Sequence, residues 1–119
     1  MVRVEITPDK LIIHVLGMDK VWAMKSSLEL PIAHISGAEV GIDPTDKEML
    51  KHKIRVGSHV PGVVTAGSYH SEGHIVFWDV HHEDKAISVT VTHDKYTKLI
   101  LEVEDPAAVV AAIRARLAK

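Results

Sequence analysis

Histidine is the residue type in this sequence that most readily suggests chemistry, with nine copies in 119 residues. His70 and His74 flank a predicted turn at 71–73, while His81 and His82 follow at the far end of the next strand. Zinc needs several ligands that converge at about 2 Å. The two pairs lie roughly 20 to 25 Å apart at about 3.3 Å per residue, so they cannot share one ion within a flat hairpin. We therefore predict no metal site, and His70 and His74 are the only candidate ligands.

Acid–base chemistry has two further candidate pairs. Asp79 and His81 would share one face of a strand, and His93 directly precedes Asp94. A nucleophilic triad would need a serine in a strained turn, and no G-x-S-x-G motif occurs. No glycine is followed by the lysine and hydroxyl pair of a phosphate-binding loop. We therefore predict no catalytic residue, no cofactor and no enzymatic activity.

The composition limits the remaining functions. Hydrophobic residues make up 46% of the chain and charged residues 25%, which is typical of a folded domain, and we expect one domain over 1–119. The formal net charge is −2, so no global positive field attracts nucleic acid. The absence of cysteine excludes disulfides and thiol chemistry. No apolar run reaches the roughly 20 residues of a membrane-spanning helix. Because strand-like alternation starts at Val2, we also expect no signal peptide. We expect a soluble, cytoplasmic protein.

Strands must position most of these residues. Apolar residues alternate with polar ones at 2–7 and 87–91, and two strand-like segments at 63–70 and 74–82 are joined by a hairpin signal at 71–73. The segment 32–42 contains two glycines, which favours a bent or bulged strand. Further short strands are expected at 11–16, 21–24, 28–30, 54–56 and 99–103.

Two helix starts are visible. Asp43 followed by Pro44 is typical of a cap and a first helical residue, and it predicts a short helical turn. Asp105 followed by Pro106 predicts a longer, alanine-rich helix at the C-terminus. One stripe of that helix should face a sheet, and the alanines would allow a close approach. The stripe consists of Val109 or Val110, Ile113 and Leu117.

The strand around 75–82 is apolar on both faces. Phe77 and Trp78 should point in opposite directions. One alternative is that both pack inside, one beneath the helix and one beneath a loop. The other is that Val76, Trp78 and Val80 form an exposed apolar strip for self-association.

Several segments resemble bacterial pleckstrin-homology-like (PH-like) domains, and the resemblance covers nearly the whole chain. The segments are E-I-T-P-D-K-L-I-I-H (5–14), L-E-L-P-I-A-H-I (28–35), V-P-G-V-V-T-A-G-S-Y (60–69), F-W-D-V (77–80) and L-I-L-E-V-E-D-P (99–106). The resemblance implies two roughly orthogonal antiparallel sheets, a barrel or sandwich, capped by one C-terminal helix. It also implies ring-like homo-oligomers for some members. Lipid-binding relatives use basic residues in the first hairpin loop, which here carries Asp9 and Lys10.

These observations together favour a non-catalytic binding or scaffolding module that self-assembles into homo-oligomers and binds an unidentified protein or small molecule. A peripheral membrane or lipid-headgroup binder is the alternative, and a histidine-dependent metal protein or enzyme is the third. Because histidine protonates near pH 6.5, assembly could change in mild acid.

Overall fold

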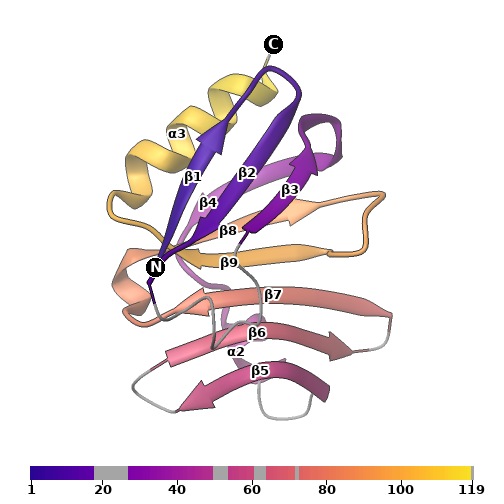
Figure 1. Ribbon diagram of the computed structural model, residues 1–119, viewed down its shortest axis with the longest axis vertical. Helices are drawn as coiled ribbons and strands as arrows, with labels where there is room; N and C mark the ends of the chain where they lie inside the picture. The colour runs from indigo at the N-terminus through magenta and orange to yellow at the C-terminus, as the bar shows by residue number, and fades with distance from the viewer. Residues whose placement is uncertain (18–26, 50–53, 61–63, 72, 119) are drawn as a thin grey trace.

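The computed structural model describes residues 1–17, 27–49, 54–60, 64–71 and 73–118. The strand expected at 21–24 lies outside these ranges. Two sheets make up the fold (Figure 1). The smaller sheet contains β1 (Val2–Ile6), β2 (Lys10–Val15) and β3 (Ser27–Pro31) in that order. None of the helices in the described ranges has the length and hydropathy needed to cross a membrane.

The larger sheet has six strands in the order β4-β8-β9-β7-β6-β5. Strand β9 lies between β8 and β7, and its pairing with β7 is parallel whereas the other pairings are antiparallel. This parallel pair departs from the two antiparallel sheets that the resemblance implies. The strands are β4 (Ile35–Val40), β5 (Ile54–Val60), β6 (Val64–Ser71), β7 (His74–Val80), β8 (Ala86–Val91) and β9 (Lys98–Glu102).

The two sheets stack face to face, and the strands of the smaller sheet run steeply across those of the larger one (Figure 1). A main core fills the space between them, because each strand turns alternate apolar residues inward. Its largest fully buried side chains include Phe77, Leu11, Ile13 and Leu99. The predicted class, mainly β with two sheets and a C-terminal helix, is confirmed, and the arrangement is a sandwich and not a closed barrel.

Helix α3 (Pro106–Leu117) forms where the sequence predicts it. The carboxylate of Asp105 accepts a hydrogen bond from the amide of Ala108 at 3.2 Å, which satisfies one of the free donors of the first turn. Val110 and Ile113 are buried in the main core, so the predicted sheet-facing stripe is confirmed. The alanines of α3 are exposed, in contrast to their expected role in close packing.

Two arginines of α3 join the helix to both sheets. Nε of Arg114 donates to the carbonyl of Ala38 at 2.8 Å, and Arg116 donates to the carbonyl of Pro8 in the β1–β2 turn. The amide of Gly41 pairs with Ala86 on β8, so the alternation of the antiparallel ladder turns the backbone groups of Ala38 away from β8. Arg114 therefore satisfies an outward carbonyl on the edge strand of the larger sheet, which protects this edge from pairing with another chain.

A second core lies on the other face of the larger sheet. It contains Tyr69, Val76, Trp78, Val80, Ala86 and Ile100, with Ile42 packed against it. Helix α2 (Pro44–Met49) lies on this side of the sheet, behind it in Figure 1. The predicted cap is confirmed, because Oδ1 of Asp43 accepts from the amide of Thr45 at 2.8 Å and Pro44 is the first helical residue.

Candidate functional site

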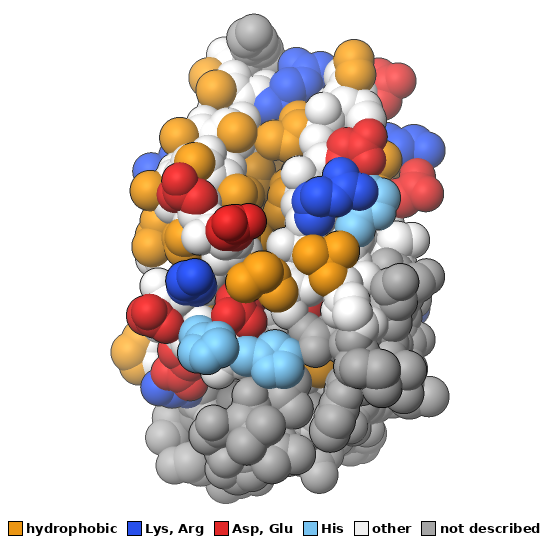
Figure 2. Space-filling view, turned by 60° about the vertical axis from the view of Figure 1, so that its left-hand side comes forward, with side chains coloured by type: hydrophobic (Ala, Val, Ile, Leu, Met, Phe, Trp, Pro, Cys, Tyr) orange, Lys and Arg blue, Asp and Glu red, His pale blue; other side chains and the backbone are white. Residues whose placement is uncertain are grey.

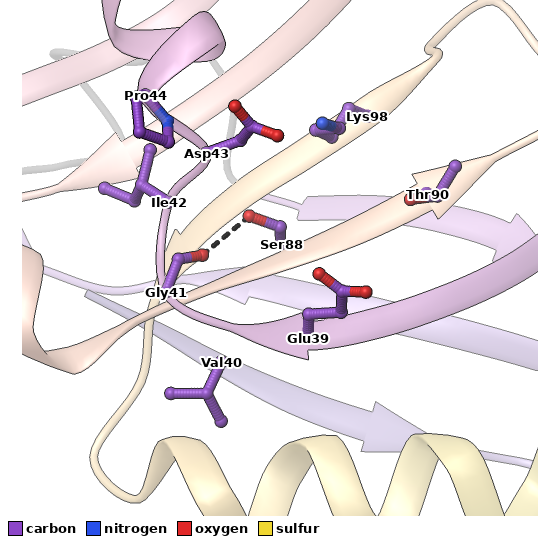
Figure 3. A pocket seen from close by; sticks show the side chains of 9 residues that line it. All are labelled: Glu39, Val40, Gly41, Ile42, Asp43, Pro44, Ser88, Thr90 and Lys98. Carbon is purple, nitrogen blue, oxygen red and sulfur yellow. Dashed lines mark hydrogen bonds between the residues drawn. The ribbon is translucent and has the colours of Figure 1, made fainter.

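The candidate site is a polar pocket of about 290 Å³ on the face of the larger sheet that carries α2. Its walls are the end of β4, the linker from β4 to α2, and neighbouring parts of β8 and β9. Figure 3 shows Asp43, Lys98, Thr90 and Glu39 arranged around the hollow. We call it the Glu39–Lys98 pocket.

Strand register explains why these polar side chains meet. Glu39 lies opposite Ser88, and Thr90 lies opposite Lys98, so all four side chains are on one face of the sheet. This face changes character along the sheet: it is apolar over β6 and β7, where it forms the second core, and polar over β4 and β8.

Lys98 is held by α2. Its Nζ lies 2.8 Å from Oδ2 of Asp46, and Asp46 is only 7% exposed. A carboxylate with so little access to water needs a charged partner, because burial of an isolated charge is costly. The Lys98–Asp46 pair therefore fixes α2 across the sheet and leaves the positive charge of Lys98 largely compensated.

Asp43 stands at the entrance to α2 and faces Lys98 in Figure 3. The hydrogen bond from the backbone amide of Thr45 lowers the pKa of Asp43 most, and a hydrogen bond from the Thr45 side chain lowers it further. Burial raises the pKa to a smaller extent, and the charge of Lys98 lowers it least. Asp43 is therefore ionised at neutral pH. With Glu39 nearby and Lys98 already paired, the pocket is net negative.

The pocket lining suits binding better than bond breaking. The hydroxyl of Ser88 donates to the carbonyl of Gly41 at 2.7 Å, which fastens the linker to β8. No histidine is among the described residues that line it, so none of these residues offers Ser88 an imidazole base. The carboxylates and the Thr90 hydroxyl can accept hydrogen bonds from a ligand cation.

His70 and His74 do not converge. His70 pairs with Ile75 across the β6–β7 hairpin and His74 pairs with Ser71, so the two imidazoles belong to opposite faces of the ribbon. Among the described residues no group of three or more histidine, aspartate or glutamate side chains is arranged to hold a metal ion. The hairpin itself forms as predicted, with Gly73 at φ 82° in its turn.

Val76, Trp78 and Val80 do not form an exposed strip. They are 4%, 2% and 4% exposed and belong to the second core, so the expectation of a surface for self-association at these residues is wrong. The alternative that both aromatics pack inside holds: Phe77 is in the main core and Trp78 in the second. Strand alternation predicts the opposite directions, but it does not show that the second face is covered.

Sequence reasoning missed a buried pair of carboxylates. Asp79 and Glu102 are 0% and 1% exposed, and the terminal amine of Met1 lies 3.2 Å and 3.8 Å from their oxygens. Nδ1 of His82 and the amide of His81 donate to Glu102 at 2.9 Å and 3.0 Å. The sequence did contain a signal for this pair, because Asp79 and Glu102 are charged residues inside the apolar runs F-W-D-V and L-I-L-E-V. The cluster joins the ends of β7 and β9 to the residue before β1.

A separate apolar hollow of about 530 Å³ lies between α3 and the smaller sheet (Figure 2). Val4, Leu16, Val109 and Glu104 are among its lining residues.

In the first hairpin, Nζ of Lys10 lies 3.0 Å from Oε1 of Glu29. This lysine is therefore engaged with a carboxylate, which reduces what the loop offers to a lipid phosphate.

Comparisons of this chain with protein-family models, with curated proteins and with solved structures find no match. The resemblance to PH-like domains stays a prediction from sequence.

Proposed function

We propose that this domain is a non-catalytic binding module whose Glu39–Lys98 pocket receives the cationic end of a small ligand, an ammonium or a guanidinium group. The observation that carries the proposal is the excess of carboxylate among the described lining residues, whose one lysine, Lys98, is already paired with Asp46. Charge-assisted hydrogen bonds from such a cation to carboxylate oxygens are among the stronger polar contacts in proteins.

The size of the pocket supports a small ligand or one end of a larger one. Sites for drug-sized molecules enclose about 300 to 1,000 Å³, and this pocket is at the lower limit of that range. The lining supports a role without catalysis, because its described residues offer acceptors without a paired nucleophile and base.

The test is an NMR titration of the protein with methylguanidinium chloride and with n-butylammonium chloride. We expect saturable shifts of the amide signals of Glu39, Asp43 and Thr90, and none with sodium acetate. Asp43→Asn is the matched variant, because asparagine caps a helix as well as aspartate does but carries no charge. It should weaken binding while α2 stays folded. Equal responses to acetate, or unchanged binding by Asp43→Asn and Glu39→Gln, would contradict the proposal.

We also propose that the module forms homo-oligomers through the edge of the larger sheet, in place of the buried residues Val76, Trp78 and Val80. Strand β5 ends the larger sheet, and within the described part of the chain it pairs with β6 alone. Terminal strands offer a row of backbone donors and acceptors to a second chain. Light scattering after size exclusion should show a mass above the monomer at high micromolar concentration, and a monomer at every concentration would contradict assembly.

A further inference from the structure

Two imidazoles come together where the turn before β4 meets the loop from β8 to β9. His34 is the last residue of the short 3-10 turn Ile32–His34 before β4, and His93 is in the loop from β8 to β9. Their ring centroids are 6.3 Å apart. The backbone holds the two segments in register, because the amide of Thr92 donates to the carbonyl of His34 at 2.7 Å.

Asp94 orients the first of these rings. Nδ1 of His34 lies 3.2 Å from Oδ2 of Asp94. An aspartate carboxylate accepts hydrogen bonds, so in the neutral ring Nδ1 of His34 carries the proton and Nε2 keeps its lone pair for another partner. Oδ1 of Asp94 accepts from the amide of Lys95 at 2.7 Å, which fixes the carboxylate in turn. A carboxylate behind a histidine in this way is the usual outer support of a metal ligand.

The second ring is presented by an unusual backbone. His93 has φ 57°, and it is the one residue other than glycine with positive φ among the described residues. This left-handed conformation is uncommon for residues with a Cβ, and it marks places where surrounding contacts determine the backbone. It turns the loop so that His93 stands beside His34.

We propose that His34 and His93 form a two-imidazole site for a divalent transition metal such as zinc, with Asp94 as a positioning residue. Imidazole nitrogens are suitable ligands for zinc, copper and nickel. Two imidazoles on one zinc ion, at about 2.0–2.1 Å per nitrogen, have centroids roughly 5 Å apart. The exposed His93 can close the remaining difference by rotating its side chain.

A metal fits this site better than an anion does. The carboxylate of Asp94 beside His34 repels anions and favours cations. Lys95, which follows Asp94 in the sequence, is directed elsewhere, since its Nζ lies over the Tyr96 ring at 5.3 Å from the ring centroid. Because the described residues supply no third ligand, water or a donor from another molecule completes the coordination. The metal is therefore exchangeable and is not required for folding.

The experiment is calorimetric titration of untagged protein with zinc chloride, with magnesium chloride as the oxygen-preferring comparison. We expect one zinc ion per chain and no magnesium binding. His34→Ala and His93→Asn should each weaken zinc binding about ten-fold or more, as should Asp94→Asn, within the 10–100-fold range for outer supports of metal ligands. Asparagine is chosen at position 93 because it tolerates left-handed backbone.

Three further measurements separate this site from adventitious binding. His74→Ala, at the exposed hairpin turn, should bind zinc like the unaltered protein. The 15N chemical shifts of the His34 ring should show the tautomer with the proton on Nδ1. In Asp94→Asn the preference for this tautomer should be weaker. Chelator should leave the melting temperature unchanged. Absence of saturable binding, unchanged affinity in His34→Ala or His93→Asn, or an equal loss in His74→Ala would overturn the proposal.

Discussion

Nζ of Lys98 on β9 lies 2.8 Å from Oδ2 of Asp46 on α2, and this pair joins the helix to the sheet beside the polar pocket. The side chains are 26% and 9% exposed, so the pair is only partly screened by water. Its removal should affect the fold and the pocket together.

Lys98→Met should lower the free energy of unfolding by about 1–3 kcal/mol, because Asp46 then has no partner for a charge that is largely shielded from water. Urea denaturation measures this change. Lys10→Met is the matched control, since it breaks the Lys10–Glu29 pair with both side chains 54% exposed, and it should cost less than about 1 kcal/mol. Equal losses in the two variants would show that Asp46 is not dependent on Lys98.

Asp105→Ala should lower the free energy of unfolding by about 1 kcal/mol, because the amide of Ala108 loses its acceptor at the start of α3. Thermal or urea unfolding measures the loss. Asp105→Asn preserves the cap and should remain close to the original stability. A loss in Asp105→Asn as large as in Asp105→Ala would assign the effect to charge and not to the hydrogen bond.

Trp78→Ala should cost about 3–5 kcal/mol, as expected for truncation of a large side chain inside a core. Trp78 is 2% exposed. Val40→Thr is the control on the edge strand, where the side chain is 56% exposed and β-branching is retained, and it should change stability by about 0.5 kcal/mol or less. A Trp78→Ala protein of nearly full stability but altered oligomeric mass would restore the exposed-strip hypothesis.

Lowering the pH should remove the contribution that Asp94 makes to the free energy of unfolding. Partial burial, which raises its pKa, is outweighed by hydrogen bonds from His34 and from the amides of Lys95 and Tyr96, so the pKa of Asp94 is lowered from 3.8. A lowered folded-state pKa stabilises the fold above the unfolded value, and this stabilisation is lost as the pH falls through the folded pKa. Urea unfolding from about pH 5 down to about pH 2 should therefore decline less steeply in Asp94→Asn than in the unaltered protein. Parallel curves for the two proteins would contradict this assignment.

Local signals in the sequence predicted the local parts of the fold. A cap followed by proline identified the start of α3, and Gly73 with flanking alternation identified the β6–β7 hairpin, because both depend on residues a few positions apart. Alternation also separated Phe77 from Trp78. These features need no knowledge of which strand lies beside which.

Distant pairings were outside the reach of such signals. The pocket depends on the pairing of Glu39 with Ser88 and on the ion pair between Asp46 and Lys98. The two residues of this ion pair are 52 positions apart in the sequence. The same limit applies to the His34–Asp94 hydrogen bond. Burial of Val76, Trp78 and Val80 could not be predicted because periodicity shows that a strand face is apolar but not what covers it.

The central place of β9 dictates how the larger sheet can be assembled. Strands β5, β6 and β7 pair in succession, and β4 pairs with β8. Among the described strands, β9 alone joins these two groups. A nascent chain that ends before Lys98 would contain two separate groups of paired strands. In each group, the strand edge that later pairs with β9 would have backbone donors and acceptors without strand partners. Insertion of β9 is thus the step that unites the sheet, and slow, non-local closure of this kind leaves intermediates prone to aggregation until β9 has paired with both neighbours.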